Sequence, residues 1–184
     1  LKKELKSLLE NNIKLNTIGN LNDLPKGARK ELTEVIEKTK NNTALTLTLA
    51  LSYGSRDEIV NVIKNISKKV VNNELQLEEI NENIINNHLY TFSLPDVDFL
   101  IRTSGEKRIS NFLLWQIAYS ELYFTNKFWP DFTKEDLFEA IVDYGFVVNN
   151  KKYGNNYDYH RAIYLLESMS FLDNNFLMTF CFSS

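Results

Sequence analysis

The sequence is poor in the residues that form covalent or metal cross-links. Among its 184 residues are one cysteine, Cys181, and two histidines, His88 and His160. A single cysteine excludes an internal disulfide framework and a zinc site built on cysteines. Two histidines exclude a histidine-rich metal centre. The fold therefore depends on its hydrophobic core, which a chain of this length can form without such cross-links.

An excess of positive charge and a long apolar run are also absent. The net charge is −3, so no overall positive field would recruit nucleic acid, and we expect no nucleic-acid partner. The first twelve residues have the pattern of a charged amphipathic helix rather than of a signal peptide. No run approaches the roughly 18 apolar residues that a membrane-spanning helix needs.

The composition is that of one globular domain, with 43% hydrophobic and 24% charged residues. Hydrophobic periodicity alternates between strand and helix along the chain. It predicts strands at 13–18, 45–51, 97–101 and 122–125, and helices at 1–12, 28–40, 55–70, 77–88, 112–119 and 133–144. Strands joined by helical crossovers favour an α/β fold: a single domain with a mainly parallel β-sheet flanked by helices.

Two strands are followed by glycine and arginine. After the strand at 97–101 comes Arg102-Thr-Ser-Gly-Glu-Lys-Arg-Ile-Ser110. Guanidinium groups bind phosphate oxygens, hydroxyls add donors, and Gly105 lets backbone N–H groups approach a ligand. This loop is a candidate site for a phosphate or diphosphate. The alternative is a solvated loop in which Glu106 pairs with its basic neighbours.

The other strand end carries Gly54, Ser55 and Arg56. A helix N-terminus with an arginine can bind phosphate. However, Ser55 and Glu58 have the spacing of a capping box, which favours a structural role.

Glu121 lies within an otherwise apolar segment. A carboxylate buried there would need a cation, because unpaired burial of a charge is unfavourable. Its partner would be Arg102, Arg108 or a Mg²⁺ ion that bridges to a bound diphosphate. A structural ion pair or an exposed edge position explains the same pattern, so the sequence leaves these alternatives open.

The segment from Pro95 to Phe124 closely resembles the signature of the cis-prenyltransferases, the undecaprenyl (polyprenyl) diphosphate synthases. Trp129-Pro-Asp-Phe132 resembles the block that follows it, and the residues from Leu49 to Ile59 resemble an earlier block. The resemblance runs to about Gly154. We therefore expect residues 1–154 to be a cis-prenyltransferase domain and residues 155–184 to be a C-terminal extension of unknown role.

The resemblance implies a transferase that condenses isopentenyl diphosphate onto an allylic diphosphate, usually farnesyl diphosphate. The product would be a long cis-polyprenyl diphosphate that carries cell-wall glycans. By resemblance, Arg102, Arg108 and Ser110 would bind isopentenyl diphosphate, Glu106 would support the loop, and Glu121 would help to hold Mg²⁺. Family members are homodimers that release their product to the membrane. This places the protein in the cytoplasm or at the periphery of the membrane surface.

The sequence also departs from the family. Nothing in it matches the family's first strand and loop, Met-Asp-Gly-Asn-x-Arg-Trp, whose aspartate handles the metal. We therefore expect this chain to lack the first elements of the fold and to be inactive alone. A non-catalytic partner subunit of a heteromeric cis-prenyltransferase is the alternative. The five retained candidate residues, Arg102, Glu106, Arg108, Ser110 and Glu121, favour the enzyme.

Overall fold

A computed structural model describes residues 4–150, 162–168 and 176–178. In these ranges the chain forms a six-stranded sheet with the strand order β1-β2-β6-β5-β3-β4. The strands are β1 (Ile13–Ile18), β2 (Leu45–Leu51), β3 (Val97–Arg102), β4 (Glu121–Phe124), β5 (Ala162–Ser168) and β6 (Phe176–Met178). The helices are α1 (Leu5–Glu10), α2 (Lys26–Thr39), α3 (Ser55–Val71), α4 (Glu82–Asn86) and α5 (Lys134–Asn150). Short 3-10 turns are η1 (Leu21–Asp23), η2 (Leu77–Glu79) and η3 (Trp129–Asp131).

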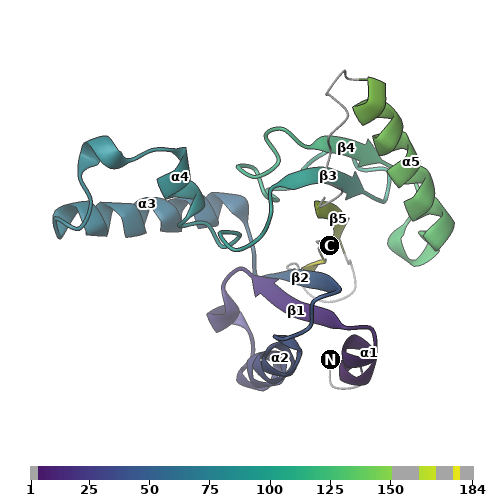
Figure 1. Cartoon of the computed structure of the whole chain (residues 1–184), viewed down its shortest axis with the longest axis horizontal. Coiled ribbons are helices and arrows are strands. Elements are labelled where there is room, and N and C mark those ends of the chain that lie inside the picture. The colour runs from purple at the N-terminus through teal and green to yellow at the C-terminus, as the bar shows by residue number, and fades with distance from the viewer. Residues whose placement is uncertain (1–3, 151–161, 169–175, 179–184) are drawn as a thin grey trace.

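The sheet is mainly parallel, which confirms the predicted fold class. Strand β1 pairs parallel with β2, and β3 pairs parallel with both β4 and β5. Strand β6 is antiparallel to its neighbours β2 and β5. Both β5 and β6 come from beyond residue 154, and they lie between β2 and β3 in the middle of the sheet (Figure 1).

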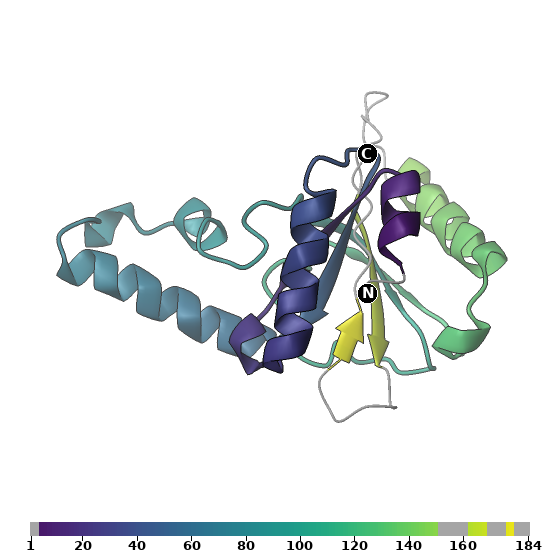
Figure 2. The same cartoon turned by 90° about the horizontal axis from the view of Figure 1, so that it is seen from below.

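Alternating residues of the strands contact different layers, as the period of two in a strand requires. Helices α1 and α2 pack on the β1–β2 pair through Leu8, Leu15, Leu32, Val35, Leu49 and Leu51. Helix α5 packs on β3 through Phe99, Ile101, Ala140 and Tyr144. Figures 1 and 2 show α1 and α2 beside β1 and β2, and α5 beside β3 and β4.

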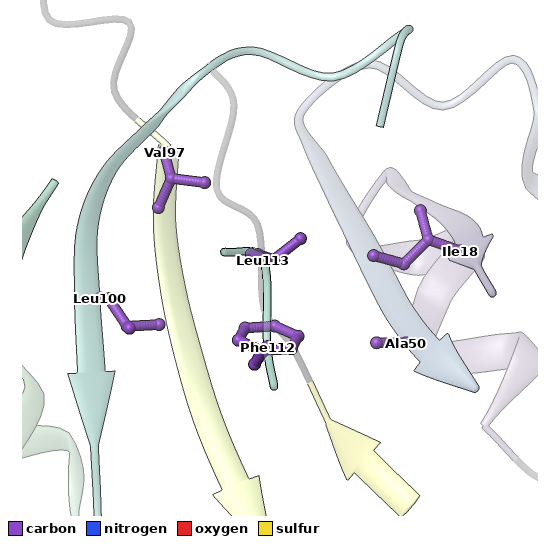
Figure 3. Close-up of a cluster of buried hydrophobic side chains, with 6 residues drawn as sticks. All are labelled: Ile18, Ala50, Val97, Leu100, Phe112 and Leu113. Carbon is purple, nitrogen blue, oxygen red and sulfur yellow. The ribbon is translucent and has the colours of Figure 1, made fainter. Parts of the chain in front are cut away.

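Other residues of the strands contact a third cluster. It connects the β1–β2 part of the sheet to β3. Ala50 of β2 and Leu100 of β3 lie in one buried group with Ile18, Val97, Phe112 and Leu113. Figure 3 shows Phe112 and Leu113 between the β3 side chains and those of β1 and β2. Because Phe112 and Leu113 are completely buried, the segment that follows the candidate loop is itself part of the core.

Helices α3 and α4 extend away from the sheet (Figures 1 and 2). They have a small core of their own, formed by Val62, Ile66 and Leu89. The prediction of one continuous helix over 77–88 is wrong, because the chain forms two short separate helices there, η2 and α4. Gln76 is the N-cap of η2 and Asn81 is the N-cap of α4, so each element starts at its own N-cap residue.

The predicted helix at 112–119 is also wrong. Residues 111–119 form turns and bends. The backbone is left-handed at Ser110, Asn111 and Leu113, with φ of 53°, 61° and 47°. Left-handed residues cannot continue a right-handed helix. The apolar spacing that suggested a helix instead reflects burial of Phe112 and Leu113 in the central cluster.

We expect Phe112→Ala to lower the free energy of unfolding by about 3–5 kcal/mol, because it removes buried contacts and leaves a cavity. Phe128→Ala is the matched control, since Phe128 is 62% exposed and surface substitutions usually change stability by less than about 0.5 kcal/mol. Urea denaturation of both variants measures the difference. Equal losses would contradict the central position of Phe112.

Candidate functional site

Arg102, the last residue of β3, is a buried cation. Only 2% of the residue is exposed, and within residues 4–150, 162–168 and 176–178 its Nε and Nη1 atoms have no hydrogen-bond partner. Burial lowers the pKa of the Arg102 guanidinium, and Arg108 lowers it further, whereas Glu106 opposes the shift. The hydroxyl of the next residue, Thr103, is also buried without a partner. Buried donors of this kind are costly unless an acceptor meets them, so the strand end favours an anion.

The loop that follows Arg102 is fastened to the loop after β4. The N–H groups of Ser104 and Gly105 donate to the carbonyl oxygens of Lys127 and Thr125, at 2.7 and 2.8 Å, and Thr125 N–H donates back to Arg102 at 2.9 Å. The N–H groups of Ser104 and Gly105 are therefore engaged by the protein, and the expected approach of backbone N–H groups to a ligand stays a prediction for the rest of the loop. Glycine is favoured at position 105, where φ is +69° and a Cβ atom would lie 3.1 Å from Asn126 Oδ1.

The other predicted anion ligands lie on the surface of the same loop. Arg108 forms an ion pair with Glu106, and Ser110 is exposed. This ion pair is the one that the solvated-loop alternative anticipated. The charges of Glu106 and Arg108 both act on Arg102, so the structure brings these three predicted residues together around one buried guanidinium.

Glu121 lies at the other end of the β3–β4 pair. It is the first residue of the edge strand β4 and is opposite Phe99, whereas Arg102 is opposite Phe124. The two positions are about 10 Å apart along the strands at the usual rise per residue. Glu121 is partly exposed, so its carboxylate is not fully buried, as fits a residue of an edge strand.

The described residues do not form a metal site by themselves. In residues 4–150, 162–168 and 176–178 there is no group of three His, Cys, Asp or Glu side chains that could hold an ion. Mg²⁺ is usually held by one or two carboxylates together with substrate phosphates and water. The role of Glu121 in holding Mg²⁺ therefore stays a prediction from the family resemblance.

The predicted capping box at the start of α3 is wrong. Gly54 is the N-cap, and Ser55 is the first residue of the helix. The hydroxyl of Ser55 accepts a hydrogen bond from Leu114 N–H at 3.0 Å. The N–H groups of Ser55 and Arg56 donate to Asn111, at 2.8 and 2.9 Å. These donors are therefore occupied by the protein, which agrees with a structural role for this helix end.

Glu58, which the sequence assigned to a capping box, is instead a buried carboxylate with distant partners. It is 1% exposed and accepts hydrogen bonds from Tyr53 Oη at 2.6 Å, Tyr90 N–H at 2.7 Å and Gln116 Nε2 at 3.1 Å. Burial raises the pKa of Tyr53, and the charge of Glu58 raises it further. Tyr53 therefore stays protonated and donates to Glu58. The partners come from three separate segments, so Glu58 holds α3, the chain after α4 and residue 116 together.

Lys127 and Asp136 fix the start of α5 beside the candidate loop. Their side chains are 2.5 Å apart, and Asp136 also accepts from Thr133 N–H at 2.8 Å. The hydrogen bond from Lys127 holds the pKa of Asp136 below its usual value, and the same bond raises the pKa of Lys127. Because the Lys127 carbonyl accepts from Ser104, this pair also contributes to holding the candidate loop.

Residues 1–154 match the family model described as "Putative undecaprenyl diphosphate synthase". The chain is 52% identical over 144 residues to the isoprenyl transferase of Clostridium tetani, covering 78% of this chain and 56% of that protein. It is 48% identical over 140 residues to the ditrans,polycis-undecaprenyl-diphosphate synthase ((2E,6E)-farnesyl-diphosphate specific) of Micrococcus luteus, covering 76% of this chain and 56% of that protein.

Solved structures have the same fold. Lavandulyl diphosphate synthase from Lavandula x intermedia, in complex with dimethylallyl diphosphate, matches with a TM-score of 0.75 at 34% identity, over 78% of this chain and 62% of that one. A probable undecaprenyl diphosphate synthase from Campylobacter jejuni matches with a TM-score of 0.66 at 39% identity, over 78% of this chain and 65% of that one.

The chain spans about half the length of the curated relatives it matches. Among the described residues, no helix combines the length and apolar character needed to cross a membrane. The sequence resemblance is confirmed over most of the chain by the family model and by relatives with about half of the aligned residues identical. The chain belongs to the undecaprenyl diphosphate synthase family, the cis-prenyltransferases.

Proposed function

We propose that this chain carries the isopentenyl diphosphate site of a prenyltransferase that extends an allylic diphosphate into a cis-polyprenyl diphosphate. The observation that carries the proposal is the buried guanidinium of Arg102, whose Nε and Nη1 atoms have no partner in the described part of the chain. A diphosphate is a polyanion with several acceptor oxygens, which suits such a donor. The names of the relatives, isoprenyl transferase and undecaprenyl-diphosphate synthase, agree with this substrate class.

The three predicted anion ligands would act differently. Arg102 is held by the end of β3 and provides a fixed, desolvated charge, which interacts with an anion more strongly than a solvated one. Arg108 is exposed and already paired with Glu106. It would exchange this surface partner for the diphosphate at small cost, because exposed ion pairs contribute little. Ser110 would add a hydroxyl donor. Glu106 would keep Arg108 beside the site before the ligand arrives.

The reaction that this site would serve joins two diphosphate substrates. The loop would bind the diphosphate of isopentenyl diphosphate and so orient its carbon chain toward the allylic partner. Farnesyl diphosphate is the proposed allylic partner, by analogy with the name of the Micrococcus luteus relative. A long product would serve as a lipid carrier for glycans. Mg²⁺ stays a prediction from the family resemblance, and no step described here depends on it.

We propose that the chain pairs with a second copy through the β4 edge. The apolar side chains exposed there and on α5 are Tyr119, Leu122, Phe124, Phe138 and Val142. An edge strand with exposed apolar residues favours association. Light scattering of the purified chain tests this pairing. Twice the chain mass of 21.5 kDa is expected, and a mass of 21.5 kDa at all concentrations would contradict the dimer.

We expect Arg102→Met to weaken the binding of isopentenyl diphosphate by roughly 10- to 100-fold, because charged hydrogen bonds contribute about 1.5–3 kcal/mol. The same variant should melt at an unchanged or higher temperature, because a buried cation with unpaired donors is replaced by an apolar side chain. Titration calorimetry with isopentenyl diphosphate and with inorganic diphosphate measures the affinity, and circular dichroism measures the melting.

Lys107→Met is the matched control, since Lys107 is an exposed cation of the same loop. It should change the affinity by much less than Arg102→Met. Absence of binding to the wild-type chain, or equal affinities of wild type and Arg102→Met, would refute the proposed site. A large drop in melting temperature for Arg102→Met would show that Arg102 is a structural residue instead.

A further inference from the structure

Asn111 connects the candidate loop to a helix that is distant in the sequence. Its backbone oxygen accepts from Ser55 N–H at 2.8 Å, and its side-chain Oδ1 accepts from Arg56 N–H at 2.9 Å. The first N–H groups of a helix have no partner within the helix. The N-cap of α3 is Gly54, which has no side chain to supply one. Asn111 therefore caps α3 from 55 residues away.

The close approach of the two segments explains the glycine. A Cβ atom at Gly54 would lie 2.8 Å from Asn111 Nδ2, which is too close for any other residue without a shift. Three further bonds attach the same segment. Leu114 N–H donates to Ser55 Oγ at 3.0 Å, Gln116 Nε2 donates to Glu58 at 3.1 Å, and Trp115 Nε1 donates to Asn86 at 2.7 Å.

The backbone of this segment needs such support. Ser110, Asn111 and Leu113 are in the left-handed region, which residues other than glycine rarely adopt. Asparagine tolerates this conformation better than most residues. A strained turn persists where the surrounding structure determines it. The hydrogen bonds of Asn111 to α3 stabilise this strained turn directly after Ser110.

We propose that Asn111 is a positioning residue of the diphosphate site. By holding the end of the Arg102–Ser110 loop on the N-terminus of α3, it fixes Ser110 and limits the motion of Arg108. Its Oδ1 and its backbone oxygen are both engaged by α3, so the role proposed for Asn111 acts through the loop and the helix. This inference deepens the proposed function and depends on it.

The experiment compares two asparagines that each cap a helix. Asn81 caps α4, where its side chain accepts from Ile84 N–H at 3.1 Å and its backbone oxygen accepts from Ile85 N–H, so its hydrogen bonds among the described residues lie within this helix. Inorganic diphosphate is titrated into the wild-type chain and into Asn111→Ala, Asn81→Ala and Asn111→Ser. Amide hydrogen exchange at Arg56 and Leu114 is measured in the same proteins. Asn111→Gly serves if Asn111→Ala does not fold, because glycine adopts the backbone but lacks the acceptor.

We expect Asn111→Ala to bind diphosphate about tenfold more weakly, since the loss of a helix cap is sufficient for a change of that order. The amides of Arg56 and Leu114 should exchange faster. Asn111→Ser keeps an acceptor and should recover part of the affinity, whereas Asn81→Ala should bind as the wild type does.

The other possible results separate the role of Asn111 from the proposed diphosphate site. Wild-type affinity in Asn111→Ala, or in Asn111→Gly where the alanine variant does not fold, would overturn the role of Asn111 and leave the proposed site intact. An equal loss of affinity in Asn81→Ala would show a general effect of stability and would also overturn it. A wild-type chain that does not bind inorganic diphosphate would refute the proposed function itself, and the positioning role with it.

Discussion

The guanidinium of Arg102 sets the physical constraint around which this site is arranged. The charge at the end of β3 is almost fully buried, and two of its nitrogens have no acceptor among the residues that the structure describes. Desolvation of a cation is unfavourable, as the lowered pKa of Arg102 indicates. Such an arrangement is stable only because the surrounding core supports it. A bound anion would supply the acceptors that the buried nitrogens need. It would thereby remove this unfavourable energy, and so it would bind there strongly.

The neighbouring segments hold the loop at both of its ends. At its start, Ser104 and Gly105 are bonded to the loop after β4, which the Lys127–Asp136 pair connects to α5. At its end, Asn111 is bonded to α3. Phe112 and Leu113 then enter the central cluster. The candidate ligands therefore lie on a short loop between two fixed points, which favours a preformed site over one that closes on the ligand.

The sequence predicted β1 to β4 and the family, because both depend on local pattern, whereas it did not predict β5 and β6. Alternation of apolar residues identified β1, β2 and most of β3, and the residues from Arg102 to Ser110 were recognised as one loop. The errors have a common cause. Glu58 had the spacing of a capping box, yet its partners are 32 and 58 residues away at Tyr90 and Gln116. Such contacts leave no periodic signal in a single sequence.

The prediction of a helix after Ser110 failed for a related reason. Its apolar spacing matched a helix, but left-handed residues at Ser110, Asn111 and Leu113 prevent one. Glu121 was expected to be buried because its neighbours are apolar, yet β4 is an edge strand, so alternate side chains remain exposed. Strand order decides this exposure, and a local pattern does not reveal strand order.

We propose the Arg102 guanidinium as the primary contact of a diphosphate. This proposal is tested most directly by nuclear magnetic resonance of the chain labelled with ¹⁵N-arginine, in which the Arg102→Met variant identifies the Nε–Hε signal of Arg102. During titration with inorganic diphosphate, we expect this signal to shift in a saturable way, because its Nε–H gains the acceptor that it lacks in the free chain. A signal that stays in place while diphosphate binds elsewhere, or at saturating diphosphate, would contradict the account.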